Sequence, residues 1–300
     1  KDAEWVLERC AKERERPFFL AVGFYRPHTP YVAPESYFKP YDLEAMPVVT
    51  GWQEDQQDIP TAGLQSHKKD HDLLTDPLRR QAIQAYYASI SFMDAQVGRV
   101  VSALDRLGLS DDTIIVFTSD HGYHMGEHGL WQKQSLFEQS ARVPLLIVAP
   151  GVGQAGTVAK APVGLVDLYP TLTELCGVTA PTNLQGQSLA PMLKEPNAPG
   201  RGWALTHVQR RAKKASFDGY SIRTPRWRYT EWDGGKSGRE LYDRESDPQE
   251  LTNLAEKQDQ SVVVAELSAK LKEILPTTYP KSGQRPALKQ QTWAPNFTHP

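Results

Sequence analysis

Apolar residues recur along the chain with two periods, which predict helices and buried strands. Spacings of three, four and seven predict a long amphipathic helix that ends before Gly108, with its apolar face formed by Ile83, Tyr87, Ile90, Val97, Val101 and Leu104. Short apolar runs at 18–24, 113–118 and 143–149 are too short for surface helices and predict buried strands. Another short helix is predicted over 165–176. Strands that alternate with helices predict an α/β fold, a mostly parallel sheet flanked by helices, over residues 1–200.

The pattern changes near residue 200. Beyond it, strand-like alternation at 220–223 and 227–232, a Gly-Gly turn and a further short strand near 240–242 predict a small antiparallel sheet. Val263, Leu267, Leu271 and Ile274 then form one face of a helix that could cover this sheet. We therefore expect residues 201–300 to form a smaller C-terminal α+β subdomain, followed by an extended tail from Pro276 onward.

Composition and charge exclude several classes of partner. The formal net charge of −2 provides no long-range field that would attract nucleic acid or an anionic membrane. The longest apolar runs have the length of strands, so no membrane-spanning helix is predicted. Cys10 and Cys176 lie far apart and lack metal-finger spacing, so neither a disulfide framework nor a zinc knuckle is expected. Recognition of a ligand should therefore be local.

Two loops that follow predicted strands carry candidate chemistry. Asp120 and His121 come directly after the run at 113–118, in a loop that contains three glycines. A carboxylate and an imidazole in such a loop can both turn toward one cation, so we interpret them as metal ligands. His28 follows the run at 18–24 and lies between two prolines, which would present its imidazole from a stiff loop.

Three further residues near this loop leave two interpretations open. His124 and His128 could line a substrate cleft, or they could simply satisfy backbone carbonyls of the loop. Trp131 could stack on a sugar ring or pack against the loop itself. The sequence does not decide between substrate binding and a structural role for any of the three.

Taken together, these segments resemble the sulfatases of the alkaline-phosphatase superfamily, and within them the iduronate-2-sulfatase-like sulfatases. The resemblance covers nearly the whole chain and is carried by PFFLAVGFYRPHTPY at 17–31, FMDAQVGRVVSALDRLG at 92–108, FTSDHGYHMGEHGLWQKQSLFEQSARVPLLIVAPG at 117–151, VDLYPTLTELCG at 166–177 and ELYDRESDPQELTNLA at 240–255. The block at 117–151 is long and specific, whereas the others are weaker alone.

The resemblance implies a calcium-dependent sulfuric ester hydrolase whose nucleophile is a formylglycine, made from the cysteine of a Cys-x-Pro-Ser-Arg motif. Asp120 and His121 match the family's second pair of metal ligands, and Lys133 matches a lysine that contacts sulfate oxygens. His28 matches an imidazole that contacts the sulfate and the leaving oxygen. The family also implies a sulfated sugar or similar ester as substrate, and a periplasmic or secreted location.

The chain departs from the family pattern because it contains no Cys-x-Pro-Ser-Arg motif, and neither of its cysteines can replace it. The first acidic metal pair is absent as well. We therefore expect residues 1–200 to be the C-terminal part of the catalytic domain, to need the N-terminal part of the same protein as partner, and to be inactive alone. No oligomeric state is predicted.

Two other functions stay open from the sequence. Asp-His-Gly also occurs in zinc phosphodiesterases of the same superfamily, and histidine suits zinc, iron or copper better than calcium, which prefers oxygen ligands. A metal-dependent phosphodiesterase or phosphonate hydrolase is therefore one alternative. The other is a catalytically inactive fragment that acts as a binding subunit.

Overall fold

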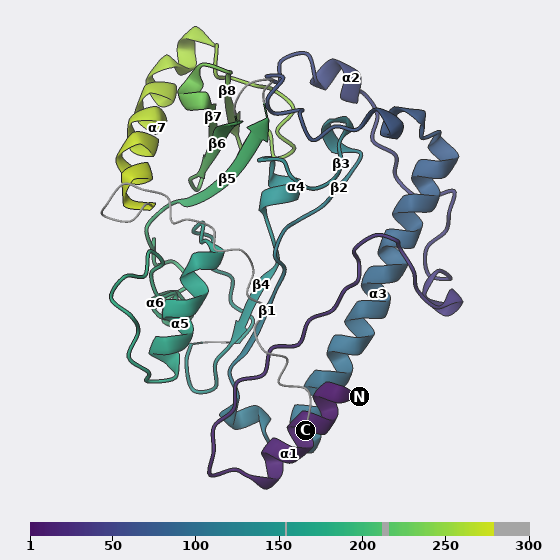
Figure 1. The fold of residues 1–300 in the computed structure, drawn as a ribbon, viewed down its shortest axis with the longest axis vertical. Coiled ribbons are helices and arrows are strands. Elements are labelled where there is room, and N and C mark those ends of the chain that lie inside the picture. The colour runs from purple at the N-terminus through teal and green to yellow at the C-terminus, as the bar shows by residue number, and fades with distance from the viewer. Residues whose placement is uncertain (154, 212–215, 279–300) are drawn as a thin grey trace.

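The elements alternate between helices and short strands in the first 200 residues and become strand-rich afterwards (Figure 1). This is a computed structural model, and it describes residues 1–153, 155–211 and 216–278. The helices are α1 (Asp2–Lys12), α2 (Trp52–Asp55), α3 (Asp76–Arg106), α4 (Glu138–Ala141), α5 (Leu168–Leu175), α6 (Ala190–Lys194) and α7 (Ser261–Ile274). The strands are β1 (Ile115–Thr118), β2 (His124–Met125), β3 (Trp131–Gln132), β4 (Leu145–Val148), β5 (Ala204–Arg211), β6 (Ser216–Arg223), β7 (Trp227–Trp232) and β8 (Arg239–Asp243).

Helix α3 is the long helix that the sequence predicts, and it runs along one side of the molecule (Figure 1). Pro77 lies in its first turn, where the missing N–H removes no helical hydrogen bond. Gly108 follows its end with φ of +64°, a left-handed conformation that suits glycine. Leu7 of α1 is buried against Ala103 and Leu104 of α3, so the first helix packs on the C-terminal end of the long one. Within the described residues, no helix combines the length and the apolar character that crossing a bilayer requires.

The predicted mostly parallel sheet is the main correction. Strands β1 and β4 form where predicted, but they pair antiparallel, with Thr118 opposite Leu145, and no parallel pair occurs among the described residues. The chain between them forms the β2–β3 hairpin and the four-residue helix α4, not a long helix that could carry it back in the parallel direction. The segment 18–24 joins no strand ladder in the described chain, so its prediction as a strand was also wrong.

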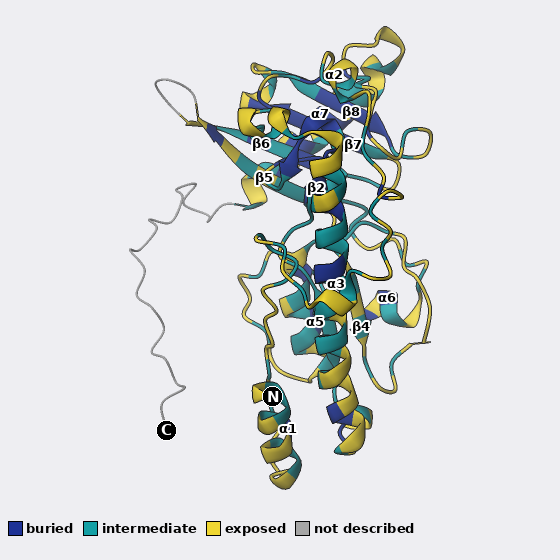
Figure 2. Cartoon of the chain, turned by 90° about the vertical axis from the view of Figure 1, so that its right-hand side faces the viewer, coloured by how far each residue is buried: buried dark blue, intermediate teal, exposed yellow. Residues whose placement is uncertain are grey.

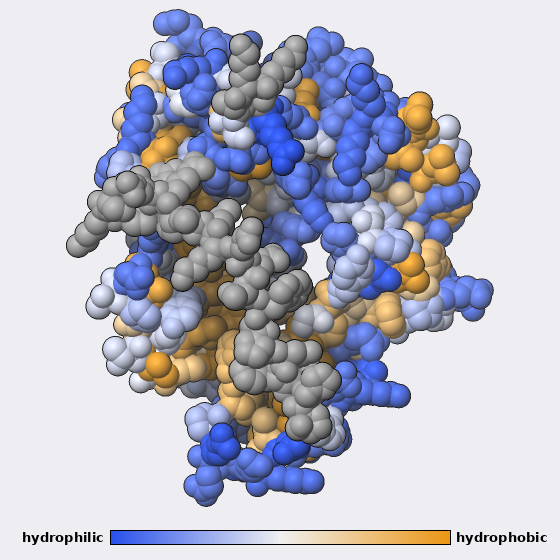
Figure 3. Space-filling view, in the orientation of Figure 1, coloured by the Kyte–Doolittle hydropathy of each residue, from blue (hydrophilic) through white to orange (hydrophobic). Residues whose placement is uncertain are grey.

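Apolar side chains remain uncovered near this two-stranded sheet. Phe19 is 86% exposed, and Leu146 and Val148 of β4 are each more than half exposed. Figure 3 shows hydrophobic residues gathered in the middle and lower part of one face of the molecule. A surface of this kind normally requires a covering element.

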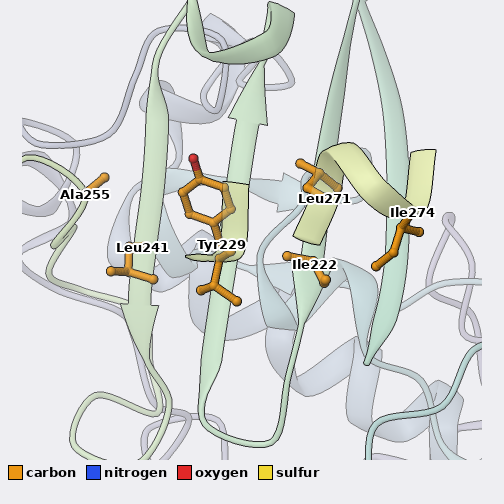
Figure 4. Packing of buried hydrophobic residues seen from close by; sticks show 7 residues of the cluster. Ile222, Tyr229, Leu241, Ala255, Leu271 and Ile274 are labelled. Atoms are coloured by element: carbon orange, nitrogen blue, oxygen red, sulfur yellow. The ribbon is translucent and has the colours of Figure 1, made fainter. Parts of the chain in front are cut away.

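The predicted antiparallel sheet of the C-terminal part is confirmed. Strands β5, β6, β7 and β8 pair in that order, each antiparallel to the next. Helix α7 covers one face, as predicted, and Figure 4 shows the shared core, formed by Ile222, Tyr229, Leu241, Ala255, Leu267, Leu271 and Ile274. Figure 2 shows that fully buried residues concentrate in this sheet.

The proposed division near residue 200 stays a prediction. Hydrogen bonds join the parts on either side of it. Arg210 of β5 donates from Nε to the backbone oxygen of Ala62 at 2.9 Å. Asn253 donates from its backbone N–H to Asp58 at 2.9 Å. The extended tail was predicted from Pro276, and residues 279–300 of it lie outside the described residues.

Candidate active site

The loop after β1 is shaped by a close approach of backbone to backbone at Gly122. Its N–H donates to the backbone oxygen of Ser140 at 2.8 Å. A Cβ atom on residue 122 would lie 2.1 Å from the oxygen of Gln139 and 2.7 Å from that of Arg142. Only glycine fits this position, so the glycine after His121 brings the loop against α4.

Asp120 and His121 present lone pairs toward each other in this loop. His121 Nε2 lies 3.6 Å from Asp120 Oδ2. His121 Nδ1 lies 2.8 Å from the backbone oxygen of Gly122, and because a carbonyl only accepts, Nδ1 carries the ring hydrogen. The lone pair on Nε2 is therefore free to bind a cation that the Asp120 carboxylate could share.

The donor set fits part of a metal site. The Asp120 side chain is 85% exposed, so its oxygens are open to further contacts. Across the residues that the structure describes, no three His, Cys, Asp or Glu side chains come together as a metal site would require. Calcium normally takes six to eight oxygen ligands. Asp120 and His121 can therefore hold such an ion only together with ligands from elsewhere.

His28 and Lys133 meet although 105 positions separate them in the sequence. Lys133 Nζ lies 2.7 Å from His28 Nε2. His28 Nδ1 lies 2.9 Å from the backbone oxygen of Thr29, which can only accept, so Nδ1 carries a hydrogen in this contact. The ammonium of Lys133 then donates to the lone pair of His28 Nε2. An imidazole and a lysine in direct contact can bind one anion and share a proton.

The family of the chain follows from a match over most of its first part. Residues 3–178 match the model of the sulfatase family, which is more than half of the chain. The chain belongs to the sulfatase family. Residues 126–276 also match the model described as N-sulphoglucosamine sulphohydrolase, C-terminal.

Individual relatives agree with this membership. A sulfatase from Formosa agariphila is 37% identical over 260 residues, which cover 84% of this chain and 48% of the relative. The choline-sulfatase of Rhizobium meliloti is 37% identical over 265 residues, which cover 86% of this chain and 50% of the relative. The crystal structure of the phosphonate monoester hydrolase of Agrobacterium radiobacter superposes with a TM-score of 0.76 at 28% identity, covering 91% of this chain and 60% of that one. This sulfatase chain thus spans about half the length of the curated relatives that it matches.

His124 and His128, the two histidines proposed for substrate binding, are both buried in the interior of this sulfatase chain. His124 is fully buried, with Nε2 at 2.7 Å from Ser135 Oγ. His128 is 1% exposed, bonds Asp55 Oδ2 through Nδ1 at 2.9 Å, and stacks on Phe137 with ring centroids 3.9 Å apart. These contacts favour the structural interpretation that the sequence left open. We therefore leave both histidines out of the proposed substrate contacts.

Trp131 is also mostly enclosed. It is buried together with Met46, Ile83 and Met125. One edge lines a small hollow together with Trp52 and Arg79. The packing interpretation accounts for nearly all of its surface, and a stacking contact with a sugar would be limited to that edge.

A buried charge network next to the candidate site was not predicted from the sequence. Arg228 of β7 is almost fully buried and bonds Glu250 Oε1 from Nε at 2.6 Å, and it also contacts the Glu138 carboxylate. Glu250 in turn accepts the backbone N–H of Glu138 at 2.8 Å. Burial would raise the pKa of Glu138, but Arg228, Arg244 and Arg223 outweigh burial and hold it below its ordinary value. The network ties α4 to the C-terminal sheet. No sequence signal marks it, because its members lie far apart along the chain.

Proposed function

We propose that the complete protein hydrolyses a sulfate ester, and the contact between His28 and Lys133 is the observation that carries this proposal. A sulfate group is a compact anion, and a lysine ammonium can hold its oxygens as a point charge. Membership of the sulfatase family supports this chemistry. Direct contact between the two side chains at 2.7 Å supports a shared role at one anion.

His28 is proposed to act as the proton donor to the leaving group. Cleavage of a sulfate ester releases an alkoxide, which is a poor leaving group, so a positioned acid lowers the barrier by a factor of about 10²–10⁴. In the observed contact the lone pair of His28 Nε2 faces the Lys133 ammonium. A protonated His28 can donate its Nε2 hydrogen to the leaving oxygen once the Lys133 ammonium has turned from Nε2 to the sulfate oxygens.

Asp120 and His121 are proposed to supply two ligands of one divalent cation, which the family resemblance suggests is calcium. When bound, such a cation supplies positive charge that orients the sulfate and stabilises the negative charge that develops on it. The nucleophile is proposed to be a formylglycine from outside these 300 residues, because the printed sequence contains no Cys-x-Pro-Ser-Arg motif.

The proposed substrate is a sulfated sugar or a similar sulfate ester. The match of residues 126–276 to the model of N-sulphoglucosamine sulphohydrolase supports a sugar. The resemblance of the block at 117–151 to iduronate-2-sulfatase-like sulfatases supports the same class. The family resemblance alone suggests a periplasmic or secreted location, which we include in this proposal.

A phosphonate or phosphodiester hydrolase is the second candidate. The observation that favours it is the superposition on a phosphonate monoester hydrolase at 28% identity. Both reactions need a metal cation and groups that hold a tetrahedral anion. The type of ester that the complete protein hydrolyses faster, a sulfate ester or a phosphonate ester, separates the two candidates.

The decisive test compares the 300-residue chain with the same chain extended upstream to the length of its relatives. With calcium present, the extended protein is expected to release sulfate from an aryl sulfate, and the 300-residue chain is not, because the proposed nucleophile lies outside it. A phenylphosphonate ester serves as the competing substrate. Comparable turnover by both proteins would locate the nucleophile within residues 1–300, and faster turnover of the phosphonate would favour the second candidate.

Replacement of Asp120 by asparagine is expected to weaken calcium binding to the extended protein. Loss of an outer-shell partner typically costs about 10–100-fold in metal affinity, so loss of a direct ligand should cost at least that much. Titration calorimetry measures the change. Asp111→Asn is the control, because Asp111 is exposed and lies outside the candidate site. Equal calcium affinity in the two variants would remove Asp120 from the metal site.

A further inference from the structure

The backbone that presents Lys133 is held in an unusual conformation. Gln132 has φ of +77° and Gln134 has φ of +76°, so both neighbours of Lys133 adopt left-handed backbone. For residues other than glycine this conformation is uncommon and unfavourable. Such a loop persists only where the surrounding structure holds it. The contacts on either side of Lys133 should therefore show what keeps its ammonium group at His28.

His124 contacts the loop on both sides of Lys133. On one side, β2 pairs with β3, and His124 stands opposite Gln132 in that ladder. On the other side, the His124 side chain reaches Ser135, with Nε2 at 2.7 Å from Oγ. One residue thus fixes the backbone immediately before Lys133 and the side chain two residues after it.

The hydrogen bond between His124 and Ser135 is enclosed in the protein interior. Ser135 Oγ accepts the backbone N–H of Phe137 at 3.3 Å and still has a hydrogen and a second lone pair for the bond to His124 Nε2. His124 is completely buried, and burial together with the neighbouring His128 lowers the pKa of His124 to about 3. Its imidazole is therefore neutral at the pH values where enzymes work, and in either neutral tautomer Nε2 can hydrogen-bond the Ser135 hydroxyl, which both donates and accepts.

We propose that His124 is a positioning residue. Through its strand pairing with Gln132 and its hydrogen bond to Ser135, it holds Lys133 against His28. The inference rests on the proposed function, since it gives Lys133 a role in sulfate-ester hydrolysis. His124 itself touches no proposed substrate atom. It acts by fixing the path of the loop from residue 131 to residue 135.

The first test is Ser135→Ala in the extended protein. Loss of the hydroxyl releases one end of the loop, so kcat with an aryl sulfate is expected to fall about 10- to 100-fold with little change in KM, as for loss of a contact that matters mainly in the transition state. Ser268→Ala is the matched control, because Ser268 is also a buried serine with one side-chain hydrogen bond, to Glu231 Oε1 at 2.6 Å, and belongs to α7. The control should keep its kcat.

The second test is rescue by a conservative change. In His124→Gln, the side-chain amide can reach the region of Nε2 and either accept from or donate to Ser135 Oγ, so kcat is expected to stay within about threefold of the starting enzyme. His124→Leu keeps the apolar bulk, removes the hydrogen bond to Ser135, and should lose as much kcat as Ser135→Ala. Equal kcat in the Gln and Leu variants, at equal melting temperature, would overturn the positioning role.

A third measurement needs no sulfatase activity. The rate at which an amine-reactive reagent modifies Lys133, read by mass spectrometry on the 300-residue chain, should rise severalfold in Ser135→Ala and stay unchanged in Ser268→Ala. An unchanged rate in both variants would overturn the inference even in an active enzyme. A raised rate in a protein that releases no sulfate would support the positioning contact and count against the proposed function alone.

Discussion

Replacement of Lys133 by alanine should lower kcat of the extended enzyme by about 10²–10³-fold, the loss typical when one donor to a developing oxyanion is removed. The proposed reason is that the Lys133 ammonium both holds sulfate oxygens and donates to His28 at 2.7 Å. Steady-state kinetics with an aryl sulfate measures the effect, and kcat should fall more than KM rises.

Lys160→Ala is the control for this change, because Lys160 is exposed and its loss leaves the contact between Lys133 and His28 in place. Circular dichroism should show the same folded protein in both variants. An extended enzyme that keeps its turnover after Lys133→Ala would remove the lysine from the mechanism and contradict its proposed contact with the sulfate oxygens.

Arg228→Leu should cost the 300-residue chain about 3 kcal/mol in free energy of unfolding, the lower end for a broken buried pair, because Glu138 and Glu250 keep only longer contacts with Arg223 and Arg244, at 3.4–3.6 Å. Arg228 is 3% exposed, and both carboxylates that it contacts, those of Glu250 and Glu138, are largely or fully buried. Leucine would fill part of the space but satisfy neither acid. Urea unfolding followed by tryptophan fluorescence measures the loss.

The neighbouring Arg226 provides a matched control. It bonds Asp243 at 2.6 Å, but its own side chain is half exposed, so water can replace the contact. Arg226→Leu should therefore cost no more than about 1 kcal/mol, the usual limit for surface ion pairs. Similar losses for the two arginines would mean that Arg223 and Arg244 fully compensate the Glu138 and Glu250 carboxylates when Arg228 is absent.

The elements that the sequence predicts well are those whose pattern is local. The spacing of apolar residues from Ile83 to Leu104 indicates α3, and strand alternation at 220–223 and 227–232 indicates the antiparallel sheet that α7 covers. The direction in which β1 and β4 pair depends on how the 26 intervening positions fold, and hydrophobic periodicity carries no information on that. The parallel prediction failed for this reason.

The candidate site divides in the same way. Asp120 and His121 are adjacent in the sequence, so residue type and position alone suggest a shared role. The proximity of His28 and Lys133 spans 105 positions, and only the family resemblance indicated it. Burial separates His124 and His128 from these residues, and a loop rich in glycine and histidine gives no signal of which side chains turn inward.

The buried charge network allows substitutions far from the site to change activity. Glu138 follows Lys133 by five positions, and its contacts with Arg228 and Glu250 connect the loop to the sheet that supplies no proposed catalytic group. A conservative exchange in β7 that leaves the protein folded can still alter the path of the chain at α4. In a screen of random variants, the C-terminal sheet would then contribute inactive proteins of normal abundance, a class usually attributed to the residues that touch substrate.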